Sequence, residues 1–276
     1  MTRGRLSVVA TPLGNLADLT PRAADTLRAA DLVAAEDTRR ARILLQHVGA
    51  RPRTMSYHAH SPPSRLDAIL AALERGASVA LVTDAGTPTV SDPGAELVRR
   101  AREAGHAVEV VPGASAVTAA LSVSGLPADR YLFLGFPPRR GSERRALLEA
   151  AARSPWTVVL FEAGPRLADL LDDLAGAADR SRRAAVGREL TKLHEEVRTG
   201  TLDELAGYYR SHEPRGEITV VLEGGRRESP ESPPADAIAR ARELLGRGLS
   251  RKDVARLLAD ELGVPRNEAY RLVTRL

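Results

Sequence analysis

The stretch VTDAGTPTVSDPG, residues 82–94, directly continues the apolar run Val79-Ala80-Leu81-Val82. The run predicts a buried strand, and two glycines, two prolines and two aspartates follow it within a few residues. Glycine lets the backbone approach a ligand closely, and proline holds a loop rigid. We interpret the stretch as a ligand-binding loop at the carboxyl end of a strand, where ligands bind in open α/β sheets. The simpler interpretation is a turn from strand to helix.

Short apolar runs alternate with longer segments of helical periodicity, which indicates a sheet covered by helices and therefore an α/β fold. Thr20 and Pro21 predict the start of one helix, and residues 95–101 predict another that ends near Gly105. The predicted strands are Leu6–Ala10, Val79–Val82, Val108–Val111, Tyr131–Gly135, Val158–Phe161 and Ile218–Leu222.

Two changes in sequence character divide the chain. Residues 224–236, GGRRESPESPPAD, are polar and rich in proline and serine, which predicts a linker. A second set of strands and helices begins after residues 112–116. We therefore expect α/β domains at 1–116 and 117–225 and a helical tail at 235–276. The tail resembles a helix-turn-helix, and its helices either bind nucleic acid or form a small bundle.

Composition limits the chemistry. The 276 residues include no cysteine, which excludes disulfides, thiolate metal sites and a cysteine nucleophile. No run approaches about 18 apolar residues, so we expect no membrane span and a cytoplasmic protein. The formal charge of +4 mildly favours an anionic partner. His58 and His60 lack further ligands at metal-site spacing, so we expect no metal.

Three strand-to-loop transitions share one composition: ATPLGNL at 10–16, TDAGTPTVSDPG at 83–94 and VPGASA at 111–116. They predict one shared pocket, with polar contacts from Asp84, Thr87 and Ser115. None is a P-loop or a GxGxxG dinucleotide motif, so ATP hydrolysis and hydride transfer are poorly supported.

Charged residues gather in three further segments. AAEDTRRAR brings Glu36, Asp37 and Arg39 together, as a structural cluster or as substrate contacts. RELTKLHEE contains Lys192, one of two lysines in the chain, and is either a solvated helix face or a site for a lysine that loses its proton. GFPPRRGSERR, residues 135–145, predicts either a phosphate-contacting loop or a plain surface loop.

Taken in order, ATPLGNLADLTPRA, AAEDTRR, LVTDAGTPTVSDPG, VVPGASAV, GFPPRR, RELTKLHEE and RGEITVVLEG resemble the ribosomal RNA small subunit methyltransferase I group of the tetrapyrrole methylase superfamily. The resemblance extends from about Leu6 to the C-terminus. It implies two α/β domains with S-adenosylmethionine in the cleft between them, a homodimer, and 2′-O-methylation of a cytidine ribose in the decoding region of 16S ribosomal RNA in the small subunit. The cofactor contacts it implies are Leu13, Asp84, Gly86, Thr87, Val90, Ser115, Ala116, Phe161, Leu190 and Ile218.

Methyl transfer to a ribose hydroxyl needs alignment and is helped by a base or cation that favours alkoxide character. The candidates are Lys192 with Glu195, Glu36 and Asp37. Predicted RNA contacts are Arg39, Arg40, Arg139, Arg140, Arg144, Arg145 and Lys252. With 3% aromatic residues, extensive base stacking is not expected.

Two other functions remain open. A C-methyltransferase acting on a precorrin- or uroporphyrinogen-type tetrapyrrole would use the same fold without an RNA-binding tail. A regulator without enzymatic activity would bind DNA through the helix-turn-helix.

Overall fold

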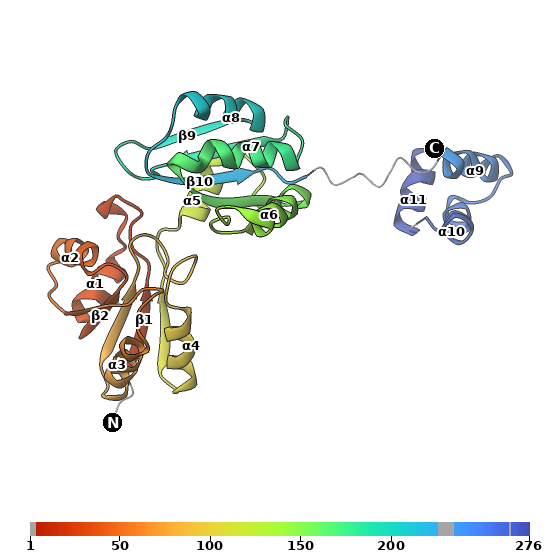
Figure 1. The fold of residues 1–276 in the computed structure, drawn as a ribbon. Coiled ribbons are helices and arrows are strands. Elements are labelled where there is room, and N and C mark those ends of the chain that lie inside the picture. The colour runs from red at the N-terminus through yellow and green to blue at the C-terminus, as the bar shows by residue number, and fades with distance from the viewer. Residues whose placement is uncertain (1–3, 226–234, 265) are drawn as a thin grey trace. The chain divides into compact units, whose positions relative to one another are not determined.

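The structure is a computed structural model that describes residues 4–225, 235–264 and 266–276. Contacts within the chain divide it into two compact units, residues 1–225 and 226–276. The first unit contains two five-stranded sheets, and the described part of the second is helical (Figure 1). The predicted α/β fold class is confirmed.

The first sheet is parallel throughout, with strand order β3-β2-β4-β1-β5. Its strands are β1 (Arg5–Val9), β2 (Leu32–Ala35), β3 (Arg53–Ser56), β4 (Ser78–Val82) and β5 (Ala107–Val111). Both faces are covered, as parallel sheets require. Leu32 and Ala34 join the core on one face, whereas Val33 and Ala35 join the core on the other.

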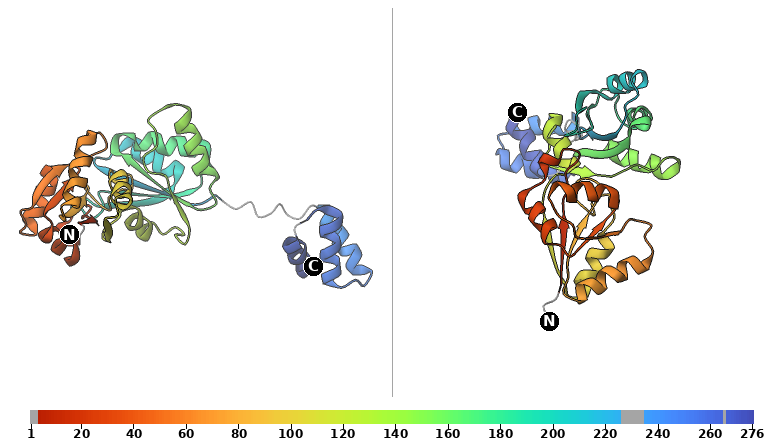
Figure 2. Two further views of the ribbon diagram at one scale, coloured as in Figure 1. Left: turned by 90° about the horizontal axis from the view of Figure 1, so that it is seen from below. Right: turned by 90° about the vertical axis from the view of Figure 1, so that its left-hand side faces the viewer.

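Helices α1 (Pro21–Ala29) and α2 (Thr38–His47) pack on one face of this sheet, and α3 (Pro63–Glu74) and α4 (Ala95–Glu103) pack on the other (Figure 2). The predicted start of α1 is confirmed, because the Thr20 hydroxyl accepts a hydrogen bond from Ala23 N at 3.2 Å and Pro21 opens the helix. A short 3₁₀ helix, Leu16–Asp18, follows β1.

The second sheet is mixed, with order β6-β7-β10-β8-β9. Its strands are β6 (Tyr131–Phe133), β7 (Thr157–Ala163), β8 (Arg183–Arg188), β9 (Glu196–Thr201) and β10 (Glu217–Leu222). β10 lies antiparallel between β7 and β8, so the carboxyl ends of β7 and β8 lie beside the start of β10.

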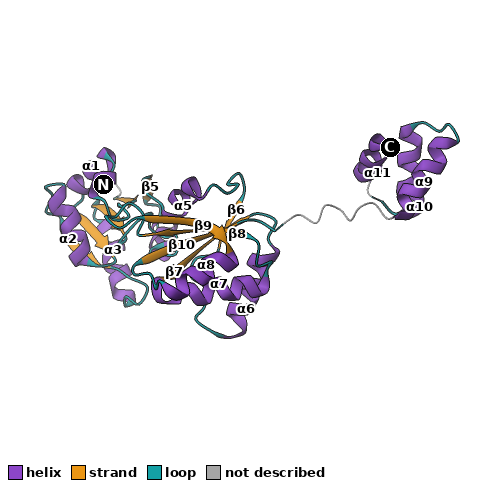
Figure 3. Cartoon of the chain, turned by 90° about the horizontal axis from the view of Figure 1, so that it is seen from above, coloured by secondary structure: helices purple, strands orange, loops and turns teal. Residues whose placement is uncertain are grey.

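Apolar cores cover both faces of the second sheet. Helices α6 (Gly141–Arg153), α7 (Leu167–Ala177) and α8 (Leu202–Ser211) pack on one face, and α5 (Ala116–Ser124) packs on the other (Figure 3). A 3₁₀ turn, Gly164–Arg166, joins β7 to α7. The chain therefore passes from the first sheet to the second between β5 and α5, at residues 112–115.

The six predicted strands are confirmed, but β2, β3, β8 and β9 were not predicted. β2 is only four residues long and lies in an alanine-rich region, and β8 also contains two alanines. β3 and β9 are edge strands with few apolar residues, so neither has a strong alternation. The interpretation of RELTKLHEE as a helix face is wrong, because this segment connects β8 to β9.

The helical unit consists, in its described residues, of α9 (Ala235–Gly246), α10 (Arg251–Leu262) and α11 (Arg266–Arg275) around its own apolar core. Ser250 caps α10 by accepting a hydrogen bond from Asp253 N at 3.2 Å. Gly263 ends this helix with a φ of 65°. Most of the predicted linker, residues 226–234, lies outside the described residues.

Candidate active site

A cavity of about 490 Å³ opens at the carboxyl ends of the strands in the first unit. Loops after β1, β2, β4 and β5 contribute to its lining, and so do the ends of β6, β7 and β8 and the start of β10. All ten residues expected to contact the cofactor line it: Leu13, Asp84, Gly86, Thr87, Val90, Ser115, Ala116, Phe161, Leu190 and Ile218. The structure thus brings the three loops identified in the sequence into one cavity.

Backbone contacts tie these loops together. Thr11 and Gly86 exchange backbone hydrogen bonds of 2.8 and 3.0 Å. The Thr87 hydroxyl donates to the carbonyl of Ala114 at 3.1 Å. Gly86 has a φ of 77°, and a Cβ there would lie 3.4 Å from a methyl carbon of Leu13. Glycine is therefore required by conformation at the centre of the cavity wall.

The backbone is strained on both sides of the cavity. Among the described residues, the non-glycine residues with positive φ are Thr89 and Ser91 in the loop after β4 and Glu189 and Thr191 in the loop after β8. Such conformations cost of order 1–3 kcal/mol each and concentrate at functional sites. Each strained loop contributes residues to the cavity lining.

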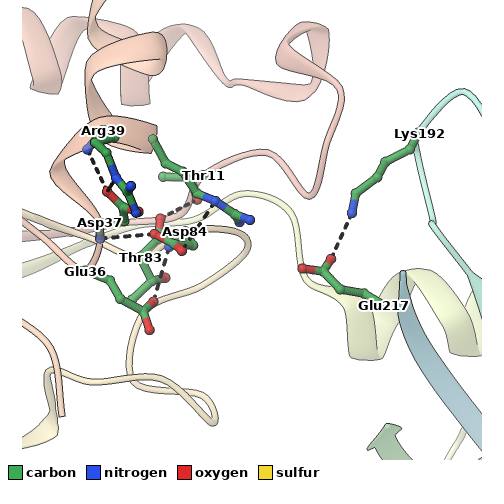
Figure 4. A network of polar contacts seen from close by, with 9 residues as sticks. Thr11, Glu36, Asp37, Arg39, Thr83, Asp84, Lys192 and Glu217 are labelled. Carbon is green, nitrogen blue, oxygen red and sulfur yellow. Dashed lines mark hydrogen bonds and ion pairs between the residues drawn. The ribbon is translucent and has the colours of Figure 1, made fainter. Parts of the chain in front are cut away.

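Carboxylates form one wall of the cavity. Asp84 Oδ1 accepts a hydrogen bond from Asp37 N at 3.1 Å, and Glu36 Oε2 accepts a long one from Asp84 N at 3.4 Å (Figure 4). Arg40 Nε lies 3.5 Å from Asp84 Oδ2. Glu36, Arg40 and Asp84 all line the cavity, so this wall combines two carboxylates with one guanidinium.

Asp92 adds a carboxylate that we did not single out from the sequence. Burial, together with the negative charge of Glu36, raises the pKa of Asp92 to about 6, and Asp84 and Glu217 act in the same direction. All four carboxylates line the cavity. Asp92 belongs to the loop quoted at the outset, but its proximity to Glu36 and Glu217 depends on contacts distant in the sequence.

Asp37 and Arg39 lie beside the cavity but do not line it. Asp37 caps α2 by accepting a hydrogen bond from Arg39 N at 2.7 Å, and the Arg39 guanidinium pairs with the same carboxylate at 2.7 Å. The hydrogen bonds from Arg39 lower the pKa of Asp37 to about 2. A carboxylate this acidic is a poor proton acceptor at neutral pH, so these contacts make Asp37 a helix cap.

Lys192 extends from the loop after β8 across the loop after β1. A Cβ on Gly14 would lie 2.3 Å from Lys192 Cγ, so the lysine stem rests directly on this glycine. Its ammonium donates to Glu189 and Glu217 at 3.0 Å each, and Figure 4 shows the bond to Glu217. Burial lowers the pKa of Lys192, but these hydrogen bonds outweigh burial and leave the pKa above its usual value. These hydrogen bonds favour the charged form of Lys192.

Glu195 and the two histidines lie outside the cavity lining. Glu195 accepts a hydrogen bond from Thr191 N at 2.5 Å and so closes the loop that carries Lys192. His58 and His60 are exposed in a turn where Ser61 accepts from His58 N at 2.8 Å. Over the described parts of the chain, no cluster of three or more His, Cys, Asp or Glu side chains is arranged to hold a metal.

The second sheet supplies most of the large apolar side chains that line the cavity. Phe161 from β7, Leu190 after β8 and Ile218 from β10 face it, together with Phe136 after β6. The rings of Phe136 and Phe161 lie 5.4 Å apart. Leu190 and Ile218 are buried in the cores of the second sheet, so this apolar wall is continuous with that domain's interior.

Arg144 differs from the other arginines that were expected to contact RNA. It is 9% exposed, and its guanidinium donates to Asp173 at 2.8 Å and to the carbonyl of Pro138 at 3.1 Å. Glu162, which is 1% exposed and lines the cavity, lies 3.8 Å from Arg144 and also pairs with Arg166. Arg144 is thus a structural residue, because its donors already have partners inside the protein.

The segment containing Arg144 is also more regular than the sequence indicated, because helix α6 begins at Gly141 and includes both Arg144 and Arg145. Arg139, Arg140 and Arg145 are exposed in or beside the short loop before this helix. Lys252 is exposed in α10 of the helical unit. Within the described residues, no helix is long and apolar enough to cross a membrane.

Known proteins resemble this chain both in sequence and in fold. Residues 5–206 match the sequence profile of the Tetrapyrrole (Corrin/Porphyrin) Methylases. Cobalt precorrin-4 methyltransferase, a cobalamin biosynthetic enzyme, superposes with a TM-score of 0.63 at 18% identity, covering 79% of this chain and 94% of that one. Uroporphyrin-III C-methyltransferase from Thermus thermophilus, solved with S-adenosylhomocysteine, gives 0.59 at 22% identity, covering 80% and 97%.

These matches define the class of protein: the chain belongs to the tetrapyrrole methylase family and is an S-adenosylmethionine-dependent methyltransferase. Within that family, its relatives include proteins named Ribosomal RNA small subunit methyltransferase I. The protein of that name from Synechocystis sp. is 43% identical over 99% of this chain and 98% of its own length. The one from Escherichia coli O157:H7 is 42% identical over 98% and 94%, and the one from Mesorhizobium japonicum is 50% identical over 84% and 78%.

The cavity fits this cofactor chemically. S-adenosylmethionine carries a sulfonium and an ammonium, and five carboxylates line the cavity: Glu36, Asp84, Asp92, Glu217 and Glu162, the last of which pairs with Arg144 and Arg166. Its adenine is flat and largely apolar, which suits the wall of Phe161, Leu190 and Ile218. The cavity thus offers both negative charge and apolar surface to one ligand that has a cationic part and a flat apolar part.

Proposed function

We propose that this protein methylates the 2′-hydroxyl of a cytidine ribose in the decoding region of 16S ribosomal RNA, acting in the cytoplasm on the small ribosomal subunit. The observation that carries the proposal is the coincidence of the ten expected cofactor residues in one cavity. Relatives named for small-subunit ribosomal RNA, at 42–43% identity over nearly the full length, support the choice of acceptor.

The cofactor supplies an electrophilic methyl group on a positively charged sulfur, a good leaving group. The residues of the chain then have to align the hydroxyl and hold its proton. Glu36 and Asp92 are the proton acceptors we propose, because both line the cavity. The pKa of Asp92, about 6, is also close to the pH at which the enzyme works. The Lys192 ammonium stays charged near the same cavity and favours alkoxide character in the attacking oxygen.

The charge of the cavity separates the two possible acceptors. A uroporphyrinogen- or precorrin-type substrate carries several carboxylates, and the acidic wall would repel them. A ribose hydroxyl on a nucleotide placed at the cavity mouth meets no such repulsion if its phosphates stay outside. The exposed guanidiniums of Arg39, Arg139, Arg140 and Arg145 are available to hold phosphates there.

The helical unit and a second copy of the chain complete the proposal. Lys252 and the neighbouring basic residues of α10 are exposed, and we assign the unit an RNA-binding function. Val110 on edge strand β5 and Val123 on α5 are exposed apolar residues in the first unit, and they support a homodimer contact.

The direct test is transfer of radiolabelled methyl groups from S-adenosylmethionine to small ribosomal subunits and, separately, to naked 16S RNA. Nuclease digestion then assigns the label to ribose or base. We expect ribose label on a cytidine. No RNA label from a protein that binds S-adenosylhomocysteine, together with label on a uroporphyrinogen acceptor, would overturn the proposal in favour of tetrapyrrole methylation.

A further inference from the structure

The chain contains three phenylalanines, and their rings form one cluster of which two, Phe136 and Phe161, line the cavity. The ring of Phe161 is 4.9 Å from that of Phe133 in an edge-on arrangement and 5.4 Å from that of Phe136 in a tilted one. Phe133 supports Phe161 from the core of the second sheet, and both Phe136 and Phe161 line the cavity. Two of the three phenylalanines therefore line the proposed methyl-transfer site, in a protein in which aromatic residues make up only 3% of the chain.

Phe136 differs from the other two in its exposure. Its side chain is 56% exposed, whereas Phe133 and Phe161 are partly buried against the apolar core around α5. Leaving a phenylalanine ring in water is unfavourable, by roughly 1.5–3 kcal/mol relative to full burial. One side of the ring contacts Phe161, so the exposed surface is available to a planar ligand at the rim of the cavity.

The loop that carries Phe136 is held in place on two sides. Phe161 N donates to the carbonyl of Gly135 at 2.9 Å, and Arg144 donates to the carbonyl of Pro138 at 3.1 Å. Gly135 has a φ of 63°, and a Cβ there would lie 2.8 Å from the hydroxyl of Ser91. The loop is therefore pinned against β7 and against the loop after β4.

The charges around Phe136 favour a nucleotide as the ligand. Arg139 and Arg140 follow it by three and four residues and are exposed, so they can hold phosphates outside the cavity. The carboxylates Glu36 and Asp92 line the cavity itself and disfavour the entry of phosphate. A nucleotide recognised here would place its backbone on the arginines and its base against the ring.

We propose that the base of the methylated nucleotide leaves the RNA stack and stacks on the ring of Phe136. This inference rests on the proposed function. Enzymes that modify a nucleotide within structured nucleic acid extrude it into a pocket and stack its base on aromatic side chains. The buried wall of Phe161, Leu190 and Ile218 then receives the cofactor, and the exposed Phe136 receives the substrate.

The test compares Phe136→Ala with Phe136→Tyr and with a control, Trp156→Ala. Trp156 is also an exposed aromatic residue, 43% exposed, but it precedes the start of β7, the opposite end of this strand from Phe161. The measurements are KM and kcat for methylation of small ribosomal subunits and, separately, the dissociation constant of S-adenosylhomocysteine.

For Phe136→Ala we expect KM for the subunits to rise about 10- to 100-fold, the effect of losing one base–aromatic stack. The dissociation constant of S-adenosylhomocysteine should stay within about twofold, Phe136→Tyr should retain wild-type KM, and Trp156→Ala should change neither quantity. An unchanged KM, or a loss of S-adenosylhomocysteine affinity as large as the rise in KM, would overturn the inference. Failure of the wild-type protein to methylate RNA would instead overturn the proposed function.

Discussion

The two sheets of the first unit contribute different surfaces to one cavity. The parallel sheet gives mainly loop residues, among them Glu36, Asp84 and Asp92, and most of the cavity's charge. The mixed sheet gives residues of the strands themselves, including Phe161 and Ile218, and most of its apolar surface. The difference teaches that strand direction decides which kind of side chain reaches a site.

The physical reason lies in strand direction, because apolar cores cover both faces of both sheets. Helices bury both faces of the parallel sheet, so its strand side chains form the core and only the loops can present polar groups. In the mixed sheet, β10 runs opposite to β7 and β8, so its first residues reach the cavity directly. Glu217, Ile218 and Thr219 line the cavity because of this reversal.

The largest effect should come from Glu36→Gln on the charged wall. The amide keeps the shape of the side chain but cannot hold the proton, so kcat for methylation should fall about 10²–10⁴-fold. The dissociation constant of S-adenosylhomocysteine, measured by calorimetry, should change much less. A loss confined to cofactor affinity would show that Glu36 binds the cofactor and takes no proton.

The next largest effect should come from Ile218→Ala on the apolar wall. Ile218 is buried in the core of the second sheet as well as lining the cavity, so the substitution should lower the free energy of unfolding by about 2–5 kcal/mol. Chemical denaturation measures this loss. If stability were unchanged while cofactor affinity fell, the apolar wall would be a binding surface independent of the core.

Asp92→Asn, on the charged wall, should increase stability, whereas Ile218→Ala should decrease it. The folded-state pKa of about 6 lies above the ordinary 3.8, so folded Asp92 holds a proton that the unfolded chain releases, and stability falls as pH rises between about 4 and 6. Asparagine removes this penalty and should raise the free energy of unfolding at pH 7 by up to about 3 kcal/mol, less to the extent that solvent screens the site.

The pH series provides the control for Asp92→Asn. The stability difference from wild type should disappear near pH 4, where Asp92 is protonated in both states. Catalysis should change in the other direction, because the variant loses one of the two proposed proton acceptors. If the difference in unfolding free energy between the variant and the wild type were the same at pH 7 and at pH 4, Asp92 would have its ordinary pKa in the folded protein.

The smallest effect should come from Gly14→Ala, which tests the contact between the loop after β1 and the side chain of Lys192. The added Cβ would overlap the Lys192 stem, and a flexible lysine can move away at little cost in stability. Its hydrogen bonds to Glu189 and Glu217 would then be disturbed. We expect about a tenfold fall in kcat with a change in unfolding free energy below about 1 kcal/mol, measured by single-turnover kinetics and denaturation.

Local signals in the sequence predicted local structure well. Thr20 with Pro21 marked a helix start that the structure confirms, because capping involves residues only a few positions apart. The same reasoning missed β3 and β9, whose pairing with a neighbouring strand is set by contacts distant in sequence. Sequence reasoning also predicted that Arg144 contacts RNA, because a run of arginines does not show which of them is buried.

The sequence by itself determined the alternation of strands and helices, the glycine- and proline-rich loops and the ten residues that meet in the cavity. The first two features follow from side-chain periodicity and backbone preference, which act over short stretches of chain, whereas the ten residues are those that the family resemblance implied. The tertiary structure alone decided the protonation of Lys192 and Asp92, the burial of Arg144 and the exposure of Phe136. Each of these depends on the charges and surfaces that other segments bring within a few ångströms, and no short stretch of sequence contains that information.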